Sequence, residues 1–293
     1  MADVWGGLMT LAELFALSLV IGVVAPLAGV GGGVLFTPIL LGFTDIHPDL
    51  VRATGLAIAT YSSIMAGTTF FKQRLSPFKL VVLASAILMP GAIVGAQVGV
   101  YITATMGTWG SGFVRTVLGV VMFAVVTLLL LKRIDWPEAR CDDKLVRVFG
   151  LEYFYHEKTL GKEVRYCPRR VGLGLFLLFF VGFASGFFGL GAAWALIPIY
   201  NLVMSLPLKV AAATANTSIA IADSAALWVY IHGGKIYPEI YIAGALAVIL
   251  GAKIGARLML IAPTRPIRLL IIGIMIFNGI QLIMRGLKEM GVV

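Results

Sequence analysis

The feature that most limits the fold of this chain is a series of long apolar runs. They lie at residues 8–28, 53–71, 78–101, 112–131, 171–188, 211–232, 239–261 and 266–284. A helix needs about 20 predominantly apolar residues to cross the hydrocarbon core of a bilayer. We therefore predict an all-α polytopic membrane protein, with the lipid bilayer as its surroundings.

The amino-acid composition excludes a soluble protein. Of the 293 residues, 60% are hydrophobic and only 13% are charged, whereas soluble domains carry about 25% charged residues. This excludes an ordinary soluble enzyme, a disordered protein and a collagen-like fibre. The sequence also lacks a Walker A motif, a His-Glu-x-x-His motif and a Gly-x-Ser-x-Gly motif. We predict a protein that is not an enzyme and needs no cofactor.

The chain contains an internal repeat. Residues 29–39 match residues 189–199, residues 52–55 match 212–215, and residues 95–99 match 251–255 in the same order. The matches divide the chain into a first transmembrane repeat at 8–131 and a second at 171–288. Each half has five apolar segments, and an odd number places two successive halves in opposite orientations. Inverted repeats of this kind are typical of secondary transporters.

A polar insert at 132–170 joins the two repeats. It holds ten Lys or Arg residues and seven Asp or Glu residues, with basic pairs at both ends. The positive-inside rule predicts a cytoplasmic insert and an N-terminus outside. Its two cysteines, Cys141 and Cys167, are too few for a disulfide framework, and their spacing with His156 is unlike a metal site. Because the net charge of +9 is not gathered in one soluble basic domain, we predict no nucleic-acid partner.

Two glycine-rich breaks are the first candidate site. Each precedes a short apolar run, at 33–44 and 192–205, too short to span the bilayer and typical of a broken or re-entrant helix. Free backbone N–H groups where such a helix restarts can bind an anion. The alternative is close helix packing by small residues. The candidate residues are Gly29, Gly31, Gly32, Gly33, Val34, Thr37, Gly189, Gly191, Ala192, Ala193 and Trp194.

Two further groups of polar residues complete the candidates. Thr54, Asn216, Thr217 and Ser218 lie near the starts of the helices that follow the breaks, where they either face a ligand or cap and pack the helices. Asp223 and Lys253 lie in the middle of apolar runs, where a charge is costly. They form either a structural ion pair or a site at which Asp223 accepts a coupling proton.

At these residues the sequence resembles the TauE/SafE sulfite exporter family, also called the toluene sulfonate uptake permease family. The resemblance rests on the glycine segments 28–33 and 186–191, each followed by a proline, on Arg52-Ala53-Thr54, on 213–218, and on 251–257. It covers both apolar halves. The second half departs from the pattern with Gly191-Ala192-Ala193 where the first half has three glycines.

The resemblance implies a bacterial inner-membrane carrier for a small sulfur-containing anion, such as sulfite or an organosulfonate. It also implies transport, most simply export, that a proton or other ion gradient drives without ATP. A channel, a carrier for another small solute, and a non-transport membrane assembly protein that uses the insert are the alternatives. The direction of transport, the coupling ion and the oligomeric state stay open at this point.

Overall fold

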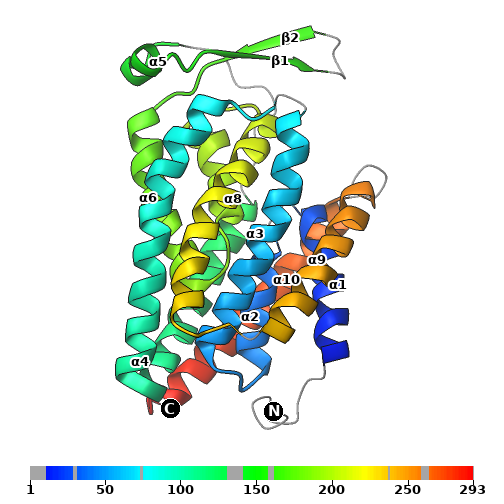
Figure 1. The fold of residues 1–293 in the computed structure, drawn as a ribbon, viewed down its shortest axis with the longest axis vertical. Helices are drawn as coiled ribbons and strands as arrows, with labels where there is room; N and C mark the ends of the chain where they lie inside the picture. The colour runs from blue at the N-terminus through cyan, green and yellow to red at the C-terminus, as the bar shows by residue number, and fades with distance from the viewer. Residues whose placement is uncertain are drawn as a thin grey trace.

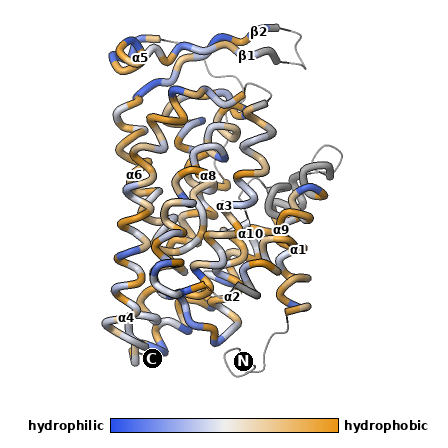
Figure 2. Tube along the Cα trace, in the orientation of Figure 1, coloured by the Kyte–Doolittle hydropathy of each residue, from blue (hydrophilic) through white to orange (hydrophobic). Residues whose placement is uncertain are grey.

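The computed structural model describes residues 11–28, 32–72, 75–130, 141–157, 162–236, 238–258 and 264–292. These residues form a bundle of helices with a small polar lobe at one end (Figure 1). The apolar residues follow the helices, and polar residues gather in the lobe and at the helix ends (Figure 2). The prediction of an all-α membrane protein is confirmed. Among the residues that the structure describes, the sheet is limited to two antiparallel strands in the lobe.

The helices of the first repeat follow the predicted segments closely. They are α1 (Leu11–Ala28), α2 (Gly33–Phe43), α3 (Pro48–Lys72) and α4 (Phe78–Leu130). The α4 span is two helices, because Gly107 has non-helical dihedral angles (φ 54°, ψ −125°) at which the chain doubles back. Glycine tolerates the positive φ that this reversal needs. The repeat therefore contains the five predicted segments.

The second repeat has the same order of elements. They are α6 (Val171–Phe188), α7 (Ala193–Pro198), which continues as the π-helical turn η2 (Ile199–Val203), α8 (Leu208–His232), α9 (Pro238–Leu258) and α10 (Thr264–Glu289). The helices α3 and α8 begin at 48 and 208, a few residues before the apolar runs, because their first turns are polar or contain proline.

The packing repeats along with the sequence. A Cβ atom at Gly95 of α4 would lie 2.1 Å from Phe183 O of α6, and one at Gly251 of α9 would lie 2.5 Å from Leu19 O of α1. Both glycines therefore mark close crossings between equivalent helices of the two repeats. Such small-residue contacts let helix backbones approach inside a bilayer, so these glycines serve packing.

The lobe contains α5 (Lys144–Phe149), β1 (Tyr153–Glu157) and β2 (Lys162–Tyr166), with the strands antiparallel. Asp143 caps α5 by accepting from Leu145 N at 2.9 Å, and it accepts from Val171 N of α6 at 2.8 Å. Cys141 and Cys167, too few for a framework of several disulfides, form a single disulfide that closes the lobe. The lobe lies at the opposite end of the bundle from the Leu11 end of α1 and the end of α10 (Figure 1).

Candidate functional site

The two breaks meet inside the bundle. The helix α1 enters from the end opposite the lobe, and α6 enters from the lobe end, where Val171 N donates to Asp143 (Figure 1). The breaks that follow these helices are joined by Thr37 of α2, whose Oγ1 donates to Gly189 O at 2.7 Å. The structure therefore confirms re-entrant elements, and it places one from each repeat in direct contact.

Glycine is required at this contact because backbones touch backbones. Gly189, which ends α6, has a φ of +65°, and a Cβ atom there would lie 2.2 Å from Arg52 O. A Cβ atom at Gly33 would lie 2.5 Å from Leu190 O, and one at Gly55 of α3 would lie 2.7 Å from Gly189 O. Real side chains do not reach such distances, so the sequence pattern of the breaks is explained by this junction.

A buried acid lies beside the second break. Asp223 of α8 is fully buried, and its Oδ1 accepts from Ser185 Oγ of α6 at 2.8 Å. Its Oδ2 has no hydrogen-bond partner and lies 3.5 Å from the position of a Cβ atom at Gly191. The indole Nε1 of Trp194, at the start of α7, is also buried without a partner. Unpaired buried polar atoms are costly, so each of these two atoms is a candidate contact for a ligand or, at Asp223, for a proton.

The remaining predicted residues divide into two groups. Gly32, Val34, Ala192 and Ala193 are buried at the breaks, whereas Gly29 and Gly31 lie outside the described residues. The side chains of Thr54, Asn216 and Thr217 donate to carbonyl groups of their own helices, and Ser218 lies 3.3 Å from the hydroxyl of Tyr200. Thr217 also contacts Ser76, in the segment between α3 and α4. These five contacts match the capping and packing alternative.

Asp223 and Lys253 are not brought together. Asp223 is buried against Ser185 of α6, whereas the side chain of Lys253 is exposed on α9. Although Lys253 lies in the middle of its apolar run, the long stem of a lysine can extend its ammonium group toward the polar interface. The interpretation as a structural ion pair is wrong for this arrangement, and Asp223 is left as an unneutralised acid.

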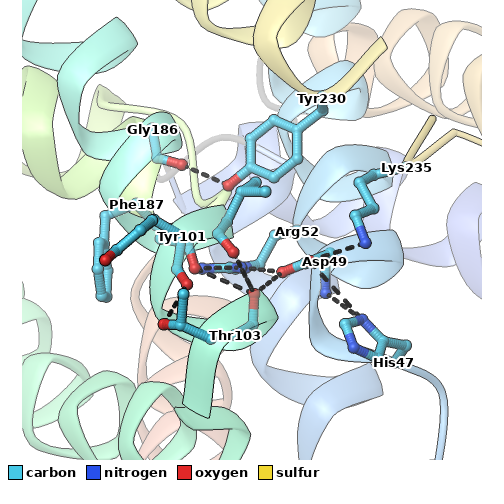
Figure 3. A network of polar contacts seen from close by, with 12 residues as sticks. His47, Asp49, Arg52, Tyr101, Thr103, Gly186, Phe187, Tyr230 and Lys235 are labelled. Carbon is cyan, nitrogen blue, oxygen red and sulfur yellow. Dashed lines mark hydrogen bonds and ion pairs between the residues drawn. The ribbon is translucent and has the colours of Figure 1, made fainter. Parts of the chain in front are cut away.

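A cluster of charged side chains lies beside the end of α6, close to the second break (Figure 3). The sequence analysis did not assign it to a site. Arg52 and Asp49 are both fully buried in the first turns of α3 and form an ion pair. Arg52 Nη1 also donates to Phe187 O in the last turn of α6, at 2.9 Å. A cation is favourable at a helix C-terminus, where carbonyl groups lack partners. Tyr230 of α8 donates to Gly186 O at 2.7 Å, so two successive carbonyl groups at the end of α6 have side-chain donors.

The end of α2 is held in an equivalent way. Arg115 of α4 donates through Nε to Leu41 O at 3.2 Å and pairs with Glu289 of α10, while Arg285 donates to Gly42 O at 3.2 Å. Arginines from other helices therefore hold the end of α6, which precedes the second break, and the end of α2, which follows the first break. An acid and a base three residues apart at a helix start, as at Asp49 and Arg52, is the sequence signal that would have found the first of these clusters.

The comparisons with known proteins agree with this architecture. The profile of the family described as "Sulfite exporter TauE/SafE" matches residues 14–282. The chain is 25% identical over 289 residues to "Probable membrane transporter protein YunE" of Bacillus subtilis, covering 95% of this chain and 99% of that protein. It is also 25% identical over 264 residues to "Probable membrane transporter protein YfcA" of Escherichia coli, covering 90% and 86%.

No solved structure matches the chain. The family match covers both repeats and the insert, and these relatives are probable membrane transporters of nearly the same length. The predicted family is therefore confirmed, and with it a membrane transporter as the class of protein. The chain belongs to the TauE/SafE sulfite exporter family.

Proposed function

We propose that this protein is a secondary transporter that moves a small sulfur-containing anion, such as sulfite or an organosulfonate, and that the anion binds between the two breaks. The observation that carries the proposal is the contact of two oppositely directed hairpins, one from each repeat, at Thr37 and Gly189. Discontinuous helices that meet at a repeat interface are where secondary transporters bind substrate. The name of the family supplies the class of anion.

Helix starts supply the recognition chemistry in this proposal. The helix α2 begins at Gly33, and the 11-residue apolar helix Ala193–Val203 begins at the second break. The first N–H groups of a helix have no partner within it and carry a partial positive charge. An oxyanion at the junction would accept from these groups and from Trp194 Nε1, which is buried without a partner. No charged side chain is then needed for the first contact.

Transport would follow from rocking of one repeat against the other. The hydrogen bond between Thr37 and Gly189 joins the repeats at the site, so a movement of this kind has to change it. We further propose that Asp223 accepts the coupling proton, because its unpaired Oδ2 lies beside Gly191 in the second break. The two repeats would correspond to 8–131 and 171–288.

The proposal is tested by the flux of radiolabelled sulfite into proteoliposomes that contain the purified protein. We expect uptake above that of empty liposomes, and about tenfold less uptake for Thr37→Val, because this change leaves the Gly189 carbonyl group buried without a donor and costs about 1–3 kcal/mol. Thr127→Val is the matched control, because Thr127 is exposed and donates only to its own helix.

Three results would contradict the proposal or part of it. Single-channel currents carried by the wild-type protein would favour a channel. Absence of flux from the intact protein, combined with loss of its cellular function on deletion of 136–168, would favour an assembly role for the insert. Equal flux in Thr37→Val and Thr127→Val would remove the junction from the proposed site.

The membrane orientation is a separate prediction. We propose an inner-membrane protein with the lobe in the cytoplasm, because basic pairs stand at both ends of the insert. A reducing cytoplasm would then open the Cys141–Cys167 disulfide that the structure contains. A membrane-impermeant maleimide added to intact cells should then leave both cysteines unlabelled, and should label them after permeabilisation without added reductant. Labelling of intact cells after treatment with an impermeant reductant would place the lobe outside, as a structural disulfide favours.

A further inference from the structure

Asp49, Arg52 and Lys235 form a charged cluster that has no role in the transport proposed above (Figure 3). We propose that Arg52 is the cationic half of a second anion site, in which the carboxylate of Asp49 occupies the place of the anion. This inference rests on the proposed transport of an oxyanion. It names a residue that would receive the substrate on its way between the break and the bundle end opposite the lobe.

The guanidinium of Arg52 is held in a fixed position before any anion arrives. Its Nη1 donates to Phe187 O at 2.9 Å, and its Nη2 donates to Gly99 O at 3.1 Å. The rings of Phe187 and Tyr230 lie with their centroids 5.9 Å from its central carbon atom. Its Nε is buried and has no partner. A guanidinium so fixed offers planar donors of the kind that bind carboxylates and other oxyanions.

Asp49 is bound to this cation through only one of its oxygens. Oδ1 contacts Arg52 and accepts from Thr103 Oγ1 at 2.8 Å. Oδ2 is buried and has no hydrogen-bond partner. It lies 3.5 Å from Lys235 Nζ and 3.9 Å from His47 Nδ1, which accepts from Asp49 N at 3.3 Å. The carboxylate of Asp49 therefore occupies the place beside Arg52 that an oxyanion would take. One of its two oxygens accepts no hydrogen bond there.

The charges of the cluster do not balance. Arg52 and Lys235 carry two positive charges, and Asp49 carries one negative charge. Partial burial, opposed by Asp49, lowers the pKa of His47 below its ordinary value, so the imidazole is neutral at pH 7. One positive charge is left over, and the ammonium of Lys235, which is 31% exposed, is the cation that solvent and a further anion can reach. The cluster is thus suited to bind a further anion or to exchange Asp49 for one.

The position of the cluster connects the surface with the break. The side chains of His47 and Lys235 are 48% and 31% exposed. The Arg52 side chain is buried, and its backbone oxygen lies against Gly189. An anion that enters at Lys235 would compete with Asp49 for Arg52 and would then be within one helix turn of the junction. Asp49 would act as a tethered competitor that closes the route when no substrate is present.

The test measures binding to the full-length protein in detergent, as thermal stability against increasing sodium sulfite with sodium gluconate holding ionic strength constant. A ligand that binds the folded state raises the apparent melting temperature. We expect Asp49→Asn to reach half of its stabilisation at a sulfite concentration at least tenfold lower than wild type. The double variant Asp49→Asn with Arg52→Gln should lose this gain.

A milder pair of variants keeps the test decisive if Asp49→Asn does not fold. Lys235→Gln removes the partly exposed cation and should raise the half-saturating sulfite concentration several-fold, whereas Lys288→Gln, an exposed lysine near the end of α10, should not. An unchanged half-saturating concentration in both Asp49→Asn and Lys235→Gln would overturn the inference. Tighter, Arg52-dependent binding by Asp49→Asn without sulfite flux in the wild type would keep the site and reject the proposed transport.

Discussion

Gly189→Ala is expected to abolish sulfite flux, most directly by preventing the two hairpins from meeting. The new Cβ atom would lie 2.2 Å from Arg52 O and 2.6 Å from both C and Cα of the same residue. All three atoms belong to the backbone, so no rotation of a side chain relieves the overlap. In addition, φ at this position is +65°, which costs a residue with a Cβ atom about 1–2 kcal/mol.

Gly234→Ala is the matched control for this change. Gly234 has a φ of +64° in the turn after α8, and a Cβ atom there would meet nothing within 4 Å. It therefore carries the dihedral cost alone, and we expect folded protein and flux close to wild type. Yield by size-exclusion chromatography and flux in proteoliposomes measure both variants. Equal yield and flux for the two alanine variants would show that the junction is not as close as described.

The segments and their order could be predicted because they depend on local composition. The bilayer requires long apolar helices, and the two short runs after the breaks, at 33–44 and 192–205, became α2 and the helix formed by α7 and η2. The inverted arrangement followed from the repeat and the odd number of segments. The start of α3 at Pro48 was missed, because Asp49 and Arg52 interrupt the apolar run.

The site could be predicted only in part, because its contacts join residues far apart in the sequence. The glycines at 33, 189 and 191 were found from their pattern, and Thr37 from its place in the first repeat. Its partner, however, is the Gly189 carbonyl 152 residues away. The predicted partner of Asp223 was Lys253, since both lie mid-run. The exposed position of Lys253 on α9 depends on helix rotation, which hydropathy does not specify.

Asp223→Asn is expected to uncouple transport from the pH gradient, with at least a tenfold loss of gradient-driven sulfite accumulation and little loss of sulfite exchange at equal pH. The amide matches the shape of the protonated acid, and its oxygen can still accept from Ser185. It cannot release or bind the coupling proton. In the wild type, the ionised carboxylate would repel an anion at the break, so acid should favour binding and alkaline pH should weaken it.

The neighbours of Asp223 make this a test of one group. Ser185 is the hydrogen-bond donor that the structure gives it, and Oδ2 has none. Other titratable side chains on the elements around α8 are Asp49, Arg52, Tyr61, Lys79, Tyr101, Arg115, Tyr200, Lys209, Tyr230 and His232. Since these remain in the variant, and sulfite itself gains a proton as the pH falls, any pH dependence of exchange that survives Asp223→Asn belongs to other side chains or to the substrate.

Two control variants separate coupling from damage. Ser224→Ala changes the adjacent exposed residue, which donates only to Ala220 O of its own helix, and should accumulate sulfite as wild type does. Lys253→Gln should also be unaffected, because the structure separates that side chain from Asp223. Loss of accumulation in Lys253→Gln would restore the ion pair as the functional unit. Full gradient-driven accumulation by Asp223→Asn would instead assign the coupling ion to another residue, because a group that cannot titrate cannot carry the proton.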